Sequence, residues 1–109
     1  MAQFDVHRNI GKQRESIPYV VIVQSSLFDS YRRRVVVPLV RRSTLNNVAT
    51  LTATSLNPMF MVEGMQVVLH PLEIVSVATD QLGEKVATLA QEGDRITGAL
   101  DELLTRAWA

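Results

Sequence analysis

Residues 19–40 read YVVIVQSSLFDSYRRRVVVPLV, two apolar runs separated by a polar stretch. Tyr19–Gln24 and Arg34–Val40 are both rich in β-branched residues, and continuous apolarity of this kind is typical of strands buried on both faces. Pro38 in the second run lacks a backbone N–H, so we expect that strand to lie at a sheet edge or to bulge at this point. The stretch therefore predicts two buried strands of a β-sheet.

Shorter patterns on both sides of this stretch extend the predicted sheet. Gln3–His7 alternates Phe4 and Val6 with polar neighbours, the period of a half-buried strand, and Asn9–Gln13 follows it as a turn. Further strands are predicted over Val48–Thr54, Met59–Val62, Gln66–Leu69 and Leu72–Ala78, with a hairpin turn at Glu63-Gly64. Five or six short strands with closely spaced turns indicate an antiparallel sheet or a small barrel.

The spacing of apolar residues changes after Gly83. Asp94 can accept hydrogen bonds at the start of a helix, and Glu84–Ala90 is interpreted as a short helix before it. An amphipathic helix is predicted from apolar residues that recur at helical spacing, namely Ile96, Leu100, Leu103, Leu104 and Ala107. The predicted fold class is mainly β (α+β) with a C-terminal α-helix, in one domain over residues 1–109.

The composition excludes several classes of protein. The 109 residues contain no cysteine, which excludes a disulfide framework, thiol catalysis and zinc sites with Cys ligands. The net charge is zero, but residues 1–42 carry eight basic and three acidic side chains, whereas residues 43–109 carry three basic and eight acidic ones. We expect the two halves to neutralise each other within one fold or across a dimer, rather than to bind nucleic acid directly. Without a signal sequence or an apolar run long enough to span a membrane, we expect a cytoplasmic protein.

The sequence lacks the residue patterns of common catalytic and cofactor sites. His7 and His70 have no partners at metal-ligand spacing, no glycine-rich phosphate loop occurs, and the serines lie in no nucleophile-elbow pattern. We therefore expect a binding protein, not an enzyme, with no metal and no cofactor.

Two polar or exposed features have no obvious structural role. Arg32–Arg34 lies at the start of a buried strand, where the three guanidinium groups could bind phosphate or acidic groups, or could keep a strand edge from pairing with other chains. Trp108 is the only tryptophan and lies one residue from the end of the sequence. Its large ring either packs against its own sheet or binds a partner.

The chain resembles the CcdB family, toxins of type II toxin–antitoxin modules, from Gln3 to about Leu104. The strongest match is Val21–Leu39, where the family has V-x-V-Q-S, an Asp, an Arg pair and V-I-P-L. Those positions are filled here by Val21, Val23, Gln24, Ser25, Asp29, Arg33, Arg34, Val36, Val37, Pro38 and Leu39. The resemblance implies an SH3-like antiparallel sheet with a C-terminal helix, assembled as a two-fold homodimer.

The resemblance also implies a function without catalysis. Family members bind the A subunit of DNA gyrase and trap the gyrase–DNA cleavage complex, so that DNA is involved only through gyrase or the antitoxin. A disordered CcdA-like antitoxin segment neutralises the toxin, and such modules serve plasmid maintenance and repress their own transcription. The gyrase-binding residues implied here are Trp108 as the anchor, Ala109, Leu104, Asp101, Leu27 and Phe28. Core packing is the alternative role for Leu27, Phe28 and Leu104.

The end of the sequence departs from the family pattern. The family tail is Trp-Gly-Ile, but this sequence ends Leu104-Thr105-Arg106-Ala107-Trp108-Ala109. In an ungapped alignment the family tryptophan falls on Thr105, so Trp108 lies three residues further along the chain. In a helix, three residues correspond to a rotation of about 300° and a rise of about 4.5 Å. Asp101 also replaces a family asparagine. One alternative is a toxin that has another target or has lost gyrase poisoning, and that acts with its antitoxin in autorepression.

A less favoured alternative comes from the ribonuclease toxins related to MazF and Kid, which use the same fold. In that interpretation Asp29 and Arg32–Arg34 would act on single-stranded RNA.

Overall fold

A computed structural model describes residues 2–44 and 56–104. In this part of the chain the strands are β1 (Asp5–Asn9), β2 (Tyr19–Ile22), β3 (Arg33–Arg41), β4 (Met59–Val62), β5 (Met65–Leu69), β6 (Val75–Ala78) and β7 (Leu82–Thr88), followed by helix α2 (Gly93–Leu104). Short 3-10 turns link them: η1 (Ser26–Phe28), η2 (Arg42–Thr44), η3 (Pro71–Glu73), η4 (Thr79–Gln81) and η5 (Ala90–Glu92). The prediction of a mainly β fold with a C-terminal helix is confirmed.

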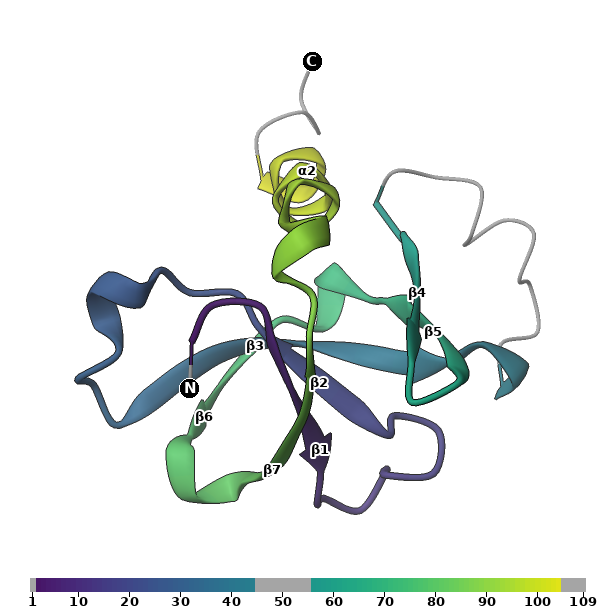
Figure 1. The fold of residues 1–109 in the computed structure, drawn as a ribbon, viewed down its shortest axis with the longest axis horizontal. Coiled ribbons are helices and arrows are strands. Elements are labelled where there is room, and N and C mark those ends of the chain that lie inside the picture. Colours follow the sequence, from purple (N-terminus) through teal and green to yellow (C-terminus); the bar gives the residue numbers. More distant parts are fainter. Residues whose placement is uncertain (1, 45–55, 105–109) are drawn as a thin grey trace.

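All strands belong to one antiparallel sheet with the order β4-β5-β3-β2-β1-β7, and β6 pairs with β3 off this path. The sheet curls into a half-barrel, with β4 and β5 at one side, β6 and β7 at the other, and α2 above it (Figure 1). β2 and β3, the two runs of the 19–40 stretch, pair in register from Tyr19 with Leu39 to Ile22 with Val36. The two valine-rich runs therefore form the centre of the sheet.

Pro38 lies on this central strand, so the prediction of a sheet edge or bulge there is wrong. On one side Pro38 is in register with Val20. On the other side β3 changes partner, since residues 33–36 pair with β6 and residues 39–41 pair with β5. The Pro38 carbonyl faces this second side, where it accepts a hydrogen bond from the His70 N–H at 3.1 Å. Pro38 therefore lies between the β3–β6 and β3–β5 pairings, at a position where neither β5 nor β6 pairs with it and its missing N–H breaks no strand pairing.

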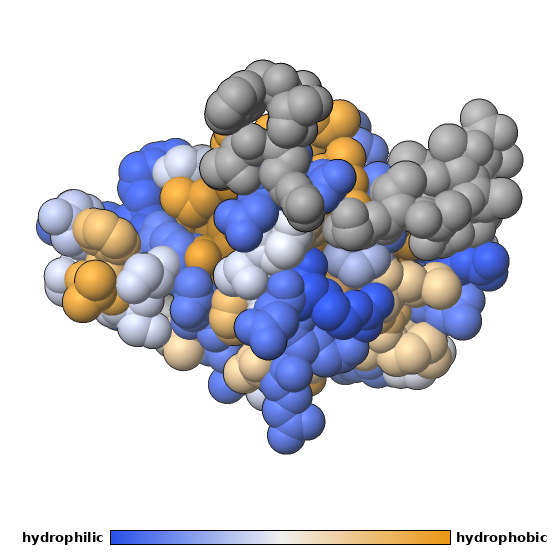
Figure 2. Space-filling model, turned by 90° about the horizontal axis from the view of Figure 1, so that it is seen from above, coloured by the Kyte–Doolittle hydropathy of each residue, from blue (hydrophilic) through white to orange (hydrophobic). Residues whose placement is uncertain are grey.

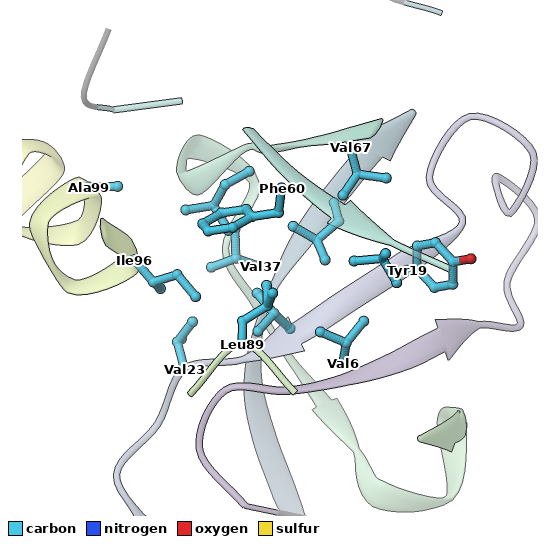
Figure 3. Packing of buried hydrophobic residues seen from close by; sticks show 13 residues of the cluster. Val6, Tyr19, Val23, Val37, Phe60, Val67, Leu89, Ile96 and Ala99 are labelled. Atoms are coloured by element: carbon cyan, nitrogen blue, oxygen red, sulfur yellow. The ribbon is translucent and has the colours of Figure 1, made fainter. Parts of the chain in front are cut away.

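The hydrophobic core lies between the sheet and α2. Val6, Val37 and Val67 of the sheet are completely buried, and Ile96 and Ala99 of the helix close the cluster over them (Figure 3). The helical periodicity predicted Ile96 and Leu100 on this face correctly, but Leu104 is exposed and the buried Ala99 was not among the predicted residues. The remaining core residues are Tyr19, Val21, Val23, Leu39, Phe60, Val62, Leu69 and Leu89.

The hairpin between β4 and β5 is confirmed. Glu63 and Gly64 both have positive φ, at 52° and 78°. Two successive residues in this conformation form the turn that matches the twist of a tight hairpin, and glycine adopts it without strain.

Other predicted boundaries differ from the structure. Glu84–Ala90 is not a short helix, because these residues lie mostly in β7, which pairs with β1. Glu, Lys and Ala favour helices locally, but the pairing with β1 outweighs that preference. The strand predicted over Leu72–Ala78 begins only at Val75, after η3, and Asp94 lies inside the first turn of α2 rather than before it. The strand predicted over Val48–Thr54 falls outside the described residues.

Candidate partner-binding surfaces

The segment that connects β2 and β3 carries exposed apolar side chains. Leu27 is 85% exposed, Phe28 46% and Tyr31 62%. The rings of Phe28 and Tyr31 contact each other edge to face, with centroids 5.6 Å apart. This segment, residues 24–33, is called the η1 loop below. It projects from one end of the molecule, and hydrophobic side chains gather at that end in the space-filling view (Figure 2). The loop presents an apolar tip to solvent.

Side-chain hydrogen bonds fix the backbone of the η1 loop. The Ser25 hydroxyl accepts the Leu27 N–H at 3.2 Å, which caps the short turn. The Gln24 amide nitrogen donates to the carbonyls of Phe28 and Arg33, at 3.4 and 3.3 Å, and its amide oxygen accepts the Val35 N–H at 2.9 Å. The loop is therefore held at its base, while its apolar tip makes no part of the core.

The C-terminal half of α2 carries the second group of predicted site residues. Leu104 is 70% exposed and Asp101 is also exposed, whereas Leu100 packs against the core. Trp108 and Ala109 lie outside the described residues. Figure 1 shows the η1 loop at one end of the molecule and α2 over its middle. The structure therefore does not bring Leu27 and Phe28 together with the helix residues in one protomer.

A second apolar surface follows β5 and was not predicted as a site. Leu72 is 68% exposed, Ile74 39% and Val75 48%. These residues span η3 and the start of β6, and η3 contacts α2. The sequence pattern predicted a strand here and did not indicate that these side chains are exposed. We call these three residues the η3 strip.

A cleft of about 760 Å³ lies at the base of the β1–β2 connection. Lys12, Arg14 and Arg41 line it together with Glu15. The Nε of Arg41 donates to the Glu15 carbonyl at 3.0 Å, so the side chain lies across the cleft wall. None of the ion pairs among residues 2–44 and 56–104 involves these three cations, so the cleft is basic. The excess of basic residues in the first 42 positions is the sequence signal for it. Its lining residues are Lys12, Gln13, Arg14, Glu15, Ser16, Arg41 and Thr44.

Within the described residues, Arg8 of the basic half forms ion pairs with the acidic half. Arg8 binds Glu63 at 3.0 Å and Glu84 at 2.8 Å, and the hydrogen bond to Glu84 raises the pKa of Arg8. The Tyr19 hydroxyl points away from the core (Figure 3) and donates to Glu63 at 2.6 Å. Burial, followed by this hydrogen bond, raises the pKa of Tyr19. This network ties the β4–β5 turn to β1 and β7.

The candidate catalytic residues of the sequence are largely engaged in the fold. Arg33 donates to the Ser76 hydroxyl and carbonyl, both at 2.8 Å, and Arg34 is buried. Arg34 is thus enclosed by the fold, whereas Arg32 and Arg33 remain exposed. His7 is buried and its Nδ1 lies 2.9 Å from the Gly83 carbonyl oxygen. Over residues 2–44 and 56–104, no three His, Asp or Glu side chains are grouped to hold a metal ion.

Comparison with known proteins shows the family of the chain. The sequence model of the family described as CcdB protein matches residues 3–105. No curated protein sequence matches the chain. Within the described ranges, no helix is long and apolar enough to cross a membrane. The family match extends over almost the entire sequence and through every element of the fold. The chain therefore belongs to the CcdB family and is a CcdB-type toxin of a toxin–antitoxin module.

Proposed function

We propose that this toxin binds the A subunit of DNA gyrase and stabilises the complex in which gyrase holds cleaved DNA, without catalysing a reaction itself. The observation that supports the proposal is the exposure of Leu27 and Phe28. The family resemblance assigns these two positions to gyrase contact, and their exposure argues against core packing as the reason for their apolar character. Burying such a side chain at an interface gains on the order of 1.5–3 kcal/mol.

The end of α2 supplies the second contact in this proposal. Leu104 is exposed there, and Trp108 and Ala109 would continue from it as the anchor. Because the η1 loop and α2 are separate in one protomer, a homodimer would allow a partner to contact the loop of one copy and the helix of the other. The η3 strip supports such a dimer, since it is apolar, exposed and adjacent to α2.

The basic cleft supports capture by an antitoxin. A disordered segment that folds on binding can cover a large surface, and its carboxylates would meet Lys12, Arg14 and Arg41 in the cleft. The cleft lies at the opposite end of β2 from the η1 loop, so antitoxin and gyrase would not compete for these residues. We expect antitoxin affinity to fall with salt concentration because exposed charges are screened.

The experiment is a gyrase cleavage assay on supercoiled plasmid, in which trapped complexes yield linear DNA after protein is removed. We expect wild-type toxin to produce linear DNA. Leu27→Ala combined with Phe28→Ala should lower the yield at least about tenfold, because two interface side chains are truncated. Ile10→Ala is the matched control, since Ile10 is 56% exposed on a different loop, and it should retain full activity. Trp108→Ala tests the predicted anchor in the same assay.

The proposal fails if wild-type protein leaves the plasmid without double-strand breaks even at large excess over gyrase. Growth arrest in cells whose gyrase resists the family would then support the alternative of a different target. Asp101 and the altered tail are the sequence features that favour this alternative.

A further inference from the structure

Arg34 is a buried cation at the beginning of β3. The residue is only 5% exposed, whereas Arg32 and Arg33 beside it are exposed. Its Nη1 donates to the carbonyls of Tyr31 and Arg33, the latter at 3.0 Å, and its Nη2 donates to the Asp29 carbonyl at 2.5 Å. All three acceptors belong to the η1 loop, so the guanidinium group lies inside the curve of the loop backbone.

The buried Arg34 guanidinium group is stabilised by the conformation of the loop. None of the ion pairs within residues 2–44 and 56–104 includes Arg34, and its buried Nε has no hydrogen-bond partner. The loop carbonyls bound by Nη1 and Nη2 therefore provide the hydrogen bonds that replace water around the cation. A loop that opened would leave the cation without these acceptors. The planar fork of arginine holds its donors in a fixed geometry that fits several carbonyls, whereas a lysine ammonium is a point charge on a flexible stem.

Gln24, the first residue of the η1 loop, also stabilises the loop backbone. Its amide nitrogen donates to the carbonyls of Phe28 and Arg33. Together the side chains of Arg34 and Gln24 donate hydrogen bonds to the carbonyls of residues 28, 29, 31 and 33, which therefore face the inner side of the loop. The side chains of Leu27, Phe28 and Tyr31 are left exposed on the outside, with Tyr31 packed against Phe28. Polar groups on the inner side of the loop thus fix an apolar outer side.

We propose that Arg34 is a positioning residue that holds the η1 loop in its partner-binding shape before a partner arrives, and that Tyr31 is part of the surface it presents. The inference rests on the proposed function for the identity of the partner. A loop that is already ordered loses less conformational entropy on binding, so its apolar contacts contribute more fully to affinity. In the sequence, Arg32–Arg34 is one basic run, and the roles of its three residues separate only in the structure.

The first test is hydrogen exchange of the free protein, which does not involve gyrase. In Arg34→Lys, amides of residues 26–33 should exchange at least about tenfold faster, while amides of β5 and α2 keep their wild-type rates. Arg32→Lys is the matched control, and it should leave the loop rates unchanged because Arg32 is exposed. If Arg34→Lys does not fold, Gln24→Leu releases the Phe28 and Arg33 carbonyls and should show the same local acceleration.

The second test is a double-mutant cycle in affinity for the gyrase A subunit. Arg34→Lys should weaken binding about tenfold, and Phe28→Ala should then cost clearly less affinity than in the wild type, since both act through one loop. The losses of affinity caused by Arg34→Lys and Ile10→Ala should be additive. Tyr31→Ala should weaken binding at least threefold while leaving the free energy of unfolding unchanged.

The outcomes separate this inference from the proposed function. Unchanged loop exchange in both Arg34→Lys and Gln24→Leu overturns the positioning role, whether or not gyrase binds. Full additivity of Arg34→Lys and Phe28→Ala also overturns it. Wild-type protein that does not bind gyrase overturns the proposed function, and the exchange experiment then decides the role of Arg34 alone.

Discussion

The two strands and the loop of the 19–40 stretch have similar apolar residues but opposite environments. Leu39 in β3 is completely buried, whereas Leu27 in the η1 loop is 85% exposed. In β2 and β3 the backbone groups pair with neighbouring strands, and the side chains face the core or the other side of the sheet. In the loop the backbone is satisfied by Gln24 and Arg34, which face inward. Hydrophobicity alone therefore does not decide which apolar side chains of this stretch are buried, because the hydrogen-bond partners of the backbone determine which way the side chains face.

The largest expected effect compares these two leucines directly. Leu39→Ala should lower the free energy of unfolding by about 2–5 kcal/mol, because it leaves a cavity in the core. Leu27→Ala should change it by less than about 0.5 kcal/mol, since the side chain contacts mainly solvent. Urea unfolding at one fixed protein concentration measures both. Equal losses for the two variants would contradict the difference in environment.

A smaller effect is expected from two glycines of α2. A Cβ on Gly93 would lie 2.5 Å from Cε2 of Phe4, so Gly93→Ala should destabilise the protein by about 1–3 kcal/mol. A Cβ on Gly98 meets nothing within 4 Å, and Gly98→Ala should stabilise the helix by about 0.5–1 kcal/mol. Thermal or urea unfolding distinguishes them by opposite signs. A Gly93→Ala variant as stable as the wild type would show that the start of α2 does not pack closely on Phe4, and a destabilised Gly98→Ala variant would contradict the open space around Gly98.

The smallest effect concerns the hydroxyl of Tyr19 at the rim of the core. Tyr31→Phe leaves Tyr19 as the only tyrosine, so its ionisation can be followed alone by ultraviolet absorbance. Burial raises the pKa of Tyr19 above the ordinary value of 10, so the folded state keeps the proton at a pH where the unfolded state loses it. The stability from this group is complete below pH 10 and is lost as the pH rises through the raised pKa.

The control for this prediction is the double variant Tyr19→Phe with Tyr31→Phe. Its free energy of unfolding should fall less steeply above pH 10 than that of Tyr31→Phe. Identical slopes would mean that Tyr19 ionises equally easily in the folded and unfolded states.

Much of the fold could be predicted from the sequence, because local patterns determined it. The β-branched runs predicted β2 and β3, Glu63-Gly64 predicted the hairpin, and the spacing from Ile96 predicted the helix. β7 was predicted as a helix because only its pairing with β1, more than 70 residues earlier in the sequence, reveals it as a strand. Pairing over such a distance leaves no local signature.

The candidate site was predictable only in part. The resemblance selected Leu27, Phe28 and Leu104, but exposure was needed to argue against core packing for them. Tyr31 was missed, although an aromatic residue three positions after Phe28 in one loop was a usable signal. The alternation of side chains along a strand could have separated Arg34 from Arg33, because neighbouring residues face opposite sides of a sheet.

The change of partner at Pro38 has a consequence for how such a protein can evolve. β5 and β6 are each anchored separately to β3, and the chain between them pairs with neither ladder. Its exposed turn at Leu72 and Glu73 can thus gain or lose residues without shifting the register of either strand. The η3 strip lies on this same segment. An insertion there would change the exposed apolar surface of the η3 strip, while the rest of the sheet keeps its pairing.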